Sequence, residues 1–233
     1  MKNEEFSLKE LQKEKKSREK DRDYSLSGKT GSCFIRGDKI IKLYDYSKKY
    51  DTNNDLTKYK SERISFPVDY LYQKGKIIGE VLPYFKAEDL EKKVNSRSNI
   101  NFLINACQEV EKEISRFPNI LMRDIWGGNI LYSSKKGMYI IDTTDWEVGR
   151  ENYSPYNLRL FENSLLVLIE NLILTSDRQT NNEILKILYE YISDGESLLE
   201  LYKDFKKMIS LKYNYDIKNV ADAKKYIKII KRS

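Results

Sequence analysis

Residues 122–131 read MRDIWGGNIL, and residues 139–142 read YIID. Their apolar residues flank a Lys-Lys-Gly turn, which predicts a β-hairpin. The second strand would end at Asp142, so its carboxylate would lie at the open end of the hairpin beside Asn129. Hard oxygen ligands of this kind suit Mg²⁺, which keeps several waters and takes further ligands from substrate phosphates. Asp124, five residues before Asn129, is placed to accept a proton from an attacking hydroxyl.

The pattern D-x-x-x-x-N followed by D resembles the catalytic loop and metal-binding strand of the protein-kinase-like superfamily. This superfamily includes protein kinases and aminoglycoside and choline phosphotransferases. By this resemblance, Arg123 and Asp124 take the positions of the catalytic-loop arginine and the base. Asn129 and Asp142 take the positions of the two metal ligands.

The resemblance extends toward the N-terminus of the chain. Lys42, in the run IIKL at 40–43, is at the position of the strand lysine that reaches the nucleotide phosphates. Glu62 lies in a helix expected over 51–66 and would be the partner that positions Lys42. The alternative for Glu62 is that it belongs to a solvated helix face, as charged residues on amphipathic helices usually do.

The segment at 26–33, LSGKTGSC, resembles the glycine-rich loop that covers nucleotide phosphates. Gly28 and Gly31 fit the second and third glycines, and Leu26 replaces the first. The GKT tripeptide also invites a Walker A interpretation, but that motif needs a glycine where Asp23 stands. We therefore expect Gly28 and Gly31 to contact a nucleotide in the kinase-like manner.

Residues 81–85, VLPYF, resemble the hinge between the two lobes of the family. There an adenine would bond to the carbonyl of Pro83 and the amide of Phe85. A proline is compatible with this position because only its carbonyl is needed. We expect three regions: a charged arm or helix (1–23), an N-lobe (24–85) and a C-lobe (86–233).

Hydrophobic periodicity predicts an α+β protein, and the resemblance implies a two-lobed protein-kinase-like fold. The N-lobe would be an antiparallel sheet with one helix, and the C-lobe would be mainly helical. In addition to the hairpin, strands are expected over 33–36, 39–44, 68–73 and 77–85. Helices are expected over 51–66, 100–117, 157–174, 181–192, 197–211 and 217–230.

The composition of the 233-residue chain excludes several classes of catalytic and metal site. Its formal net charge is +6. It contains no histidine, which excludes Ser-His-Asp and Cys-His catalysis and imidazole ligation of a metal. Cys33 and Cys107 lack metal-ligand spacing, and no disulfide framework is expected. The N-terminus has no apolar stretch, and the most apolar run, 164–175, is shorter than the ~20 residues of a membrane span. We expect a cytoplasmic location and no membrane partner.

The resemblance implies an enzyme that transfers the terminal phosphate of ATP to a hydroxyl, with ATP and Mg²⁺ as cofactors. Lys42 would hold phosphates, and the acceptor could be a small molecule or a protein. The pair Thr143-Thr144 replaces the family's Phe-Gly, and no Ala-Pro-Glu follows. A long activation segment is therefore not expected.

Two other interpretations stay open at this point. Met122 replaces the usual histidine, and Trp126 stands where related enzymes commonly carry a cation, which fits a pseudokinase that binds nucleotide or acts as a scaffold. Alternatively, Asp124 and Asn129 could simply cap turns. We do not expect a nucleic-acid partner, because the 18 tyrosines are scattered among acidic residues.

Overall fold

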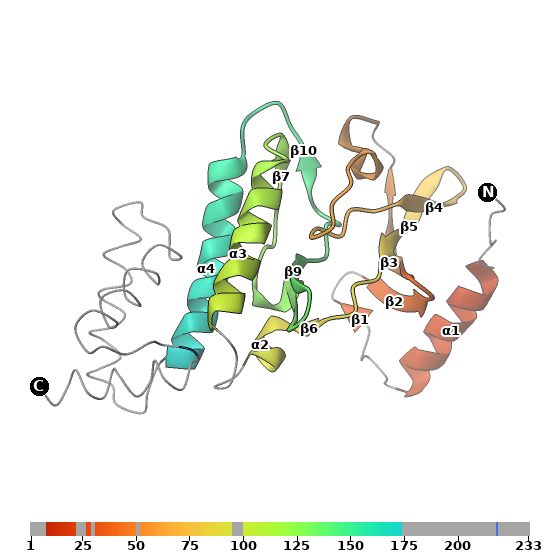
Figure 1. Cartoon of the computed structure of the whole chain (residues 1–233). Helices are drawn as coiled ribbons and strands as arrows, with labels where there is room; N and C mark the ends of the chain where they lie inside the picture. The colour runs from red at the N-terminus through yellow and green to blue at the C-terminus, as the bar shows by residue number, and fades with distance from the viewer. Residues whose placement is uncertain are drawn as a thin grey trace, which may run out of the picture. The chain divides into compact units, whose positions relative to one another are not determined.

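The computed structural model describes residues 8–21, 27–28, 31–49, 52–94, 100–173 and 218. The chain divides into two compact units. The first is Met1–Lys60 with Ser65–Phe85, and the second is Ser61–Ile64 with Lys86–Ser233. The architecture is α+β with antiparallel sheets (Figure 1). The helices expected over 181–192 and 197–211 lie outside the described residues, as does that over 217–230 apart from Lys218.

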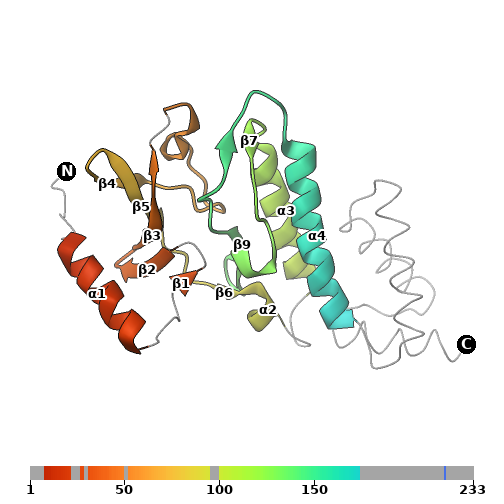
Figure 2. The ribbon, with the colours of Figure 1, turned by 180° about the vertical axis from the view of Figure 1, so that it is seen from behind.

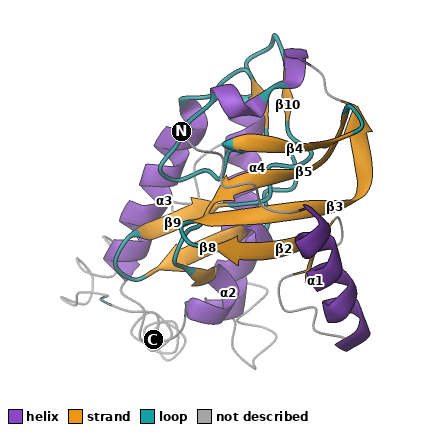
Figure 3. Cartoon of the chain, turned by 90° about the vertical axis from the view of Figure 1, so that its right-hand side faces the viewer, coloured by secondary structure: helices purple, strands orange, loops and turns teal. Residues whose placement is uncertain are grey.

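The first unit is built on one antiparallel sheet with the strand order β1-β2-β3-β5-β4 (Figure 3). Its strands are β1 (Ser27–Gly28), β2 (Gly31–Arg36), β3 (Lys39–Lys49), β4 (Asp69–Gln73) and β5 (Lys76–Pro83). Both predicted strand pairs are confirmed, because short apolar runs on either side of a glycine turn identify hairpins in sequence. Gly37, in the turn between β2 and β3, has a φ of +60°, which glycine adopts without steric cost.

One face of this sheet packs against helix α1 (Leu8–Asp21) (Figure 1). Leu11 is only 2% exposed and joins Phe34, Ile41 and Leu43 in a hydrophobic cluster. Ion pairs also link the helix to the sheet, from Lys15 to Asp45 at 2.5 Å and from Arg36 to Glu14 at 2.5 Å. Residues 8–21 of the charged N-terminal segment therefore form a helix that packs on the sheet.

The helix predicted over 51–66 is wrong. Two 3₁₀ turns, η1 (Thr52–Asn54) and η2 (Leu56–Lys58), stand within this range. The Asp55 side chain accepts hydrogen bonds from the amide of Thr57 at 3.0 Å and from its hydroxyl at 2.6 Å. Such local bonds compete with the helical backbone pattern. Tyr59 then adopts an extended conformation, which ends the helical geometry.

Residues 61–64 belong to the second unit. The carbonyl of Arg63 accepts a 2.8 Å hydrogen bond from the amide of Ile140, and the buried Ile64 forms a parallel bridge with Ile140. The hydroxyl of Ser61 donates to Glu113 at 2.6 Å. Arg63 also pairs with Glu109. A segment expected to be helical is therefore a bent, non-helical strap on the second unit.

In the second unit, helices α3 (Ile100–Ser115) and α4 (Ser154–Ile173) lie side by side (Figures 1 and 2). These confirm the helices predicted over 100–117 and 157–174. The predicted hairpin is also confirmed and forms a three-stranded sheet with the order β6-β8-β9. The remaining elements are β6 (Glu88–Asp89), α2 (Leu90–Lys93), β7 (Ile120–Leu121), η3 (Gly127–Asn129), β8 (Ile130–Ser133), β9 (Gly137–Ile140) and β10 (Glu147–Val148).

Strands β7 and β10 pair with each other and form a separate antiparallel ladder. They bracket the β8–β9 hairpin in the sequence, so the loops that enter and leave the hairpin are tied together. Among the helices of the described residues, none has the length and apolarity that crossing a membrane requires.

Candidate functional site

The β8–β9 hairpin brings the ends of two loops together in the second unit. Ile130 lies directly opposite Ile140 in the ladder, and the amide of Ile141 donates a 2.9 Å hydrogen bond to the carbonyl of Asn129. Asn129 is thus the residue before β8, and Asp142 follows β9 by two residues. The pairing places Asn129 next to the chain segment that carries Asp142.

Asn129 also closes the loop that begins at Asp124. Its side-chain amide donates a 2.9 Å hydrogen bond to the carbonyl of Asp124, and its backbone amide donates to the carbonyl of Trp126 at 2.8 Å. Because the side-chain nitrogen is used in this way, Oδ1 is the atom of Asn129 that can ligate a cation. Asp124, Asn129 and Asp142 are therefore brought together by bonds within one unit.

The two aspartates share an unusual backbone conformation. Asp124 has a φ of +55° and Asp142 a φ of +61°, in the left-handed region that non-glycine residues seldom adopt. Such residues cost free energy, persist only where their surroundings fix them, and concentrate at functional sites. The hydroxyl of Thr144 donates a 2.8 Å hydrogen bond to the Asp142 carboxylate and helps to fix it.

Buried polar side chains on α4 hold the start of the 123–129 loop. Asn157 is fully buried, accepts from the amide of Met122 at 2.9 Å and donates to the carbonyl of Ile120 at 2.7 Å. The hydroxyl of Ser164 donates to the carbonyl of Ile125 at 2.6 Å. Sequence analysis missed both residues, because nothing in a helical pattern distinguishes a buried anchor from a polar surface position.

A buried tryptophan also holds the same loop. The indole nitrogen of Trp146 donates a 2.6 Å hydrogen bond to the carbonyl of Arg123. The guanidinium of Arg123 is exposed and pairs with Glu147 at 3.1 Å. Met122 is fully buried, as expected for a side chain that serves in packing. The backbone at 122–125 is therefore fixed by three side chains.

Trp126 lies within the loop and is 57% exposed. Its ring packs on Gly128, where a Cβ atom would stand 2.3 Å from the ring. A side chain at Gly128 would therefore displace the indole. The loop between Asp124 and Asn129 thus presents an aromatic side chain to solvent at the position noted in the sequence analysis for its lack of positive charge.

Lys42 lies in the first unit, on β3, and is 4% exposed. Directly opposite on β5 is Glu80, which is 1% exposed. The Tyr44 hydroxyl donates a hydrogen bond to the Glu80 carboxylate. Burial, followed by the charge of Glu80, raises the pKa of Tyr44. Sequence analysis did not name Glu80, although a single charge inside the apolar run IIGEVLP was a usable signal.

Gly28 and Gly31 face each other in the β1–β2 ladder of the first unit. A Cβ on Gly31 would lie 2.2 Å from the carbonyl oxygen of Leu43, so glycine is required there by the close approach of β3. Pro83 ends β5 opposite Lys39, and Phe85 is the last residue of the unit.

Glu62 is exposed and stands in the strap at 61–64, which belongs to the second unit. The helix that was expected to carry it does not form. The candidate residues thus fall into two groups. Lys42, Gly28, Gly31, Pro83 and Phe85 are in the first unit, and Arg123, Asp124, Asn129, Asp142 and Glu62 are in the second.

An octahedral Mg²⁺ could take the oxygen ligands of Asn129 and Asp142 and would need water or phosphate oxygens for its other positions. No group of three or more cysteine, aspartate or glutamate side chains able to hold a metal occurs among the residues that the structure describes. The chemistry of the two available ligands suits a hard cation that is shared with a phosphate.

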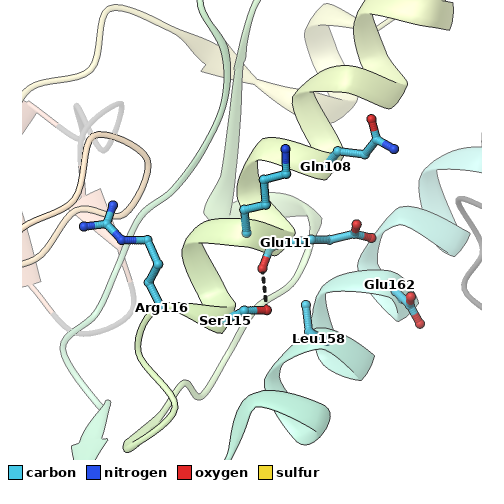
Figure 4. Close-up of a pocket in the computed structure, with 7 residues that line it drawn as sticks. Gln108, Glu111, Ser115, Arg116, Leu158 and Glu162 are labelled. Carbon is cyan, nitrogen blue, oxygen red and sulfur yellow. Dashed lines mark hydrogen bonds between the residues drawn. The ribbon is translucent and has the colours of Figure 1, made fainter.

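A separate open groove of about 580 Å³ lies between α3 and α4 (Figure 4). Its lining carries both signs of charge, and one of its polar groups is used internally, since the Ser115 hydroxyl bonds to the carbonyl of Glu111 at 2.9 Å. The lining residues are Gln108, Glu111, Lys112, Ser115, Arg116, Leu158 and Glu162. None belongs to the 123–129 loop, so this groove is distinct from the candidate site.

Comparison of the sequence with protein-family models gives no match, and comparison with curated proteins gives no significant match either.

Proposed function

We propose that the protein is a phosphotransferase of the protein-kinase-like type that moves the terminal phosphate of ATP to a hydroxyl. The observation that carries this proposal is the role of Asn129. Its side chain bonds to Asp124, and its carbonyl bonds to Ile141 beside Asp142. This joins a carboxylate able to act as a base to a pair of oxygen ligands able to hold a cation.

In this proposal Asp124 is the base. Its side chain is exposed, so an acceptor hydroxyl can approach it. The acceptor oxygen bonds to the terminal phosphorus, its proton passes to the Asp124 carboxylate, and the bond from phosphorus to the leaving oxygen of ADP breaks. Asn129 and Asp142 would hold magnesium, which neutralises phosphate charge when it is bound. The fixed backbone around 122–125 supplies the positioning that such a reaction depends on.

The wider fold belongs to the same proposal. We infer a two-lobed arrangement in which the first unit is the nucleotide-binding lobe, with Lys42, Gly28 and Gly31 near the phosphates. Pro83 and Phe85 would bond the adenine. The division into a sheet-rich unit and a unit that carries the 123–129 loop supports this inference.

The proposal is tested by measuring binding and transfer separately. Purified protein is unfolded thermally with ATP, with and without Mg²⁺. At a ligand concentration of about 100 Kd, we expect a stabilisation of about 2.7 kcal/mol that requires the metal. Asp142→Asn should lose this stabilisation, and the exposed Asp38→Asn should keep it. A wild-type protein with no magnesium-dependent stabilisation would contradict the proposal.

Transfer is followed as ADP release with a panel of small hydroxyl compounds and proteins. Asp124→Asn should bind Mg-ATP like the wild type and release ADP about 10² to 10⁴ times more slowly. Equal rates for Asp124→Asn and the wild type would remove Asp124 as the base.

A second candidate is a nucleotide-binding module without transfer activity. The exposed Trp126 favours it, because the indole supplies no positive charge for the transferred phosphate. Magnesium-dependent ATP binding without ADP release for any acceptor would support this module over the enzyme.

A further inference from the structure

We propose that Glu80 on β5 is the positioning residue that holds Lys42, in the role that sequence analysis assigned to Glu62. The inference rests on the proposed function for the use of Lys42, and on the structure of the first unit for the pairing. The expected partner of Lys42 was Glu62 on a helix, and the partner proposed here is a glutamate on the neighbouring strand β5.

The register of the sheet places the two side chains together. Lys42 is directly opposite Glu80 in the antiparallel ladder of β3 and β5, so both side chains project from the same face. This is the face opposite to the Leu11 cluster, because Ile41 and Leu43 alternate with Lys42 along β3. Directly opposed residues have Cβ atoms about 5 Å apart, which is within reach of a lysine and a glutamate.

Burial makes the pairing the favourable arrangement. With exposures of 4% and 1%, neither charge is well solvated, and an isolated buried charge is strongly unfavourable. Neighbouring hydroxyls add hydrogen-bond donors on the same face. Tyr44 bonds to Glu80, and Tyr70 lies opposite Glu80 on β4. The carboxylate is therefore embedded in a polar row that crosses three strands.

The backbone around this row is closely packed. A Cβ on Gly79 would lie 2.3 Å from the carbonyl oxygen of Lys42, so glycine lets β5 approach β3 at this point. Because both flanking strands meet β3 at glycines, the position of the Lys42 backbone is tightly set. A counter-ion on β5 would then fix the ammonium group without needing a helix.

The environment of Glu62 does not offer the same arrangement. Glu62 is exposed, is not in a helix, and belongs to the strap of the second unit. Its neighbours Ser61 and Arg63 are anchored to Glu113 and Glu109. Glu62 and Lys42 thus belong to different units, whereas Glu80 and Lys42 lie on neighbouring strands of one sheet.

The first experiment is a double-mutant cycle measured by urea unfolding without nucleotide. Lys42→Met and Glu80→Gln should each lower the midpoint, because each leaves an unpaired buried polar or charged group. The double variant should recover part of the loss, so the shifts are not additive. In the control cycle, which combines Lys42→Met with Glu62→Gln, the shifts in the urea midpoint should be additive. If Glu80→Gln does not fold, a folded double variant supports the pairing and an unfolded one overturns it.

The second experiment measures Mg-ATP turnover for the same variants. Glu80→Gln should lower kcat by about 10- to 100-fold. The relative changes in kcat and in KM should match those that Lys42→Met causes. Adding Glu80→Gln to Lys42→Met should cost no further activity, and Glu80→Asp should restore part of it. A loss caused by Glu62→Gln and not by Glu80→Gln would overturn the inference. Absence of Mg-ATP binding in the wild type would remove the proposed function, while the unfolding cycle would still decide the pairing.

Discussion

The side-chain amide of Asn129 donates a 2.9 Å hydrogen bond to the backbone carbonyl of Asp124. This bond spans the loop that contains Trp126 and its two following glycines, and it fixes one end of that loop to the other. Both residues lie in one unit, so the relationship does not depend on the rest of the chain. Removal of the Asn129 side chain should therefore change both the order of this loop and the oxygen ligand that Asn129 can offer to a cation.

We expect Asn129→Ala to lower the free energy of unfolding by about 1 kcal/mol, the usual contribution of one hydrogen bond. It should also abolish magnesium-dependent ATP binding, because a cation ligand is lost with the bond. Urea unfolding and thermal shift measure the two effects. Asn105→Ala, at an exposed position on α3, is the control and should change neither quantity.

The backbone at Asp124 gives a second prediction. At a φ of +55°, a glycine avoids the clash that a Cβ atom makes, so Asp124→Gly should be more stable than Asp124→Ala by about 1 kcal/mol. Both variants should lose phosphate transfer. Urea unfolding of the two proteins decides the first part, and an alanine variant as stable as the glycine variant would show that the loop relaxes out of this conformation.

A third prediction concerns Asn157, whose side chain holds the backbone at the start of the 123–129 loop. Asn157→Ala leaves the amide of Met122 and the carbonyl of Ile120 without their buried partner, which should cost about 2 to 4 kcal/mol of stability. Asn163→Ala, exposed on the same helix, should be nearly neutral. Unchanged stability of Asn157→Ala in urea would mean that other groups or water replace this side chain.

The two cysteines should differ in reactivity. Burial, followed by the charge of Glu111, raises the pKa of Cys107, so less thiolate is present at any pH near 8. A thiol reagent should therefore label Cys33 in the native protein and reach Cys107 only after unfolding. Native Cys33→Ser should show almost no labelling. Fast native labelling of that variant would contradict the packing of Cys107 beside Met138.

The strands of the β2–β3, β4–β5 and β8–β9 hairpins were predictable because apolar runs around glycine turns carry a local signal, whereas the two-residue strands β1, β6, β7 and β10 carry none. The β8–β9 hairpin, its flanking Asn129 and its trailing Asp142 all follow from this pattern. The roles of Asp124, Asn129 and Asp142 rest on the resemblance to kinase-like sequences and stay predictions.

The failures have physical causes that local patterns do not contain. The helix predicted over 51–66 does not form, because the Asp55 side chain makes hydrogen bonds that compete with the helical pattern. The apolar Ile64 was interpreted as part of a helix face, but it belongs to the strap at 61–64. Glu80 becomes visible as a partner of Lys42 only when the register of β3 and β5 is known. Asn157 is recognisable only from the loop carbonyl and amide that it contacts.

The strap at 61–64 also determines how the protein can be divided experimentally. Because this tetrapeptide is inserted within the stretch that forms the first unit, the chain passes between the units three times, at 60/61, 64/65 and 85/86. A fragment that begins at Lys86 would lack Arg63, whose carbonyl accepts from the amide of Ile140. It would also lack the buried side chain of Ile64, which would leave a cavity. The second unit should therefore be obtainable alone only if the peptide is supplied separately or grafted onto the fragment.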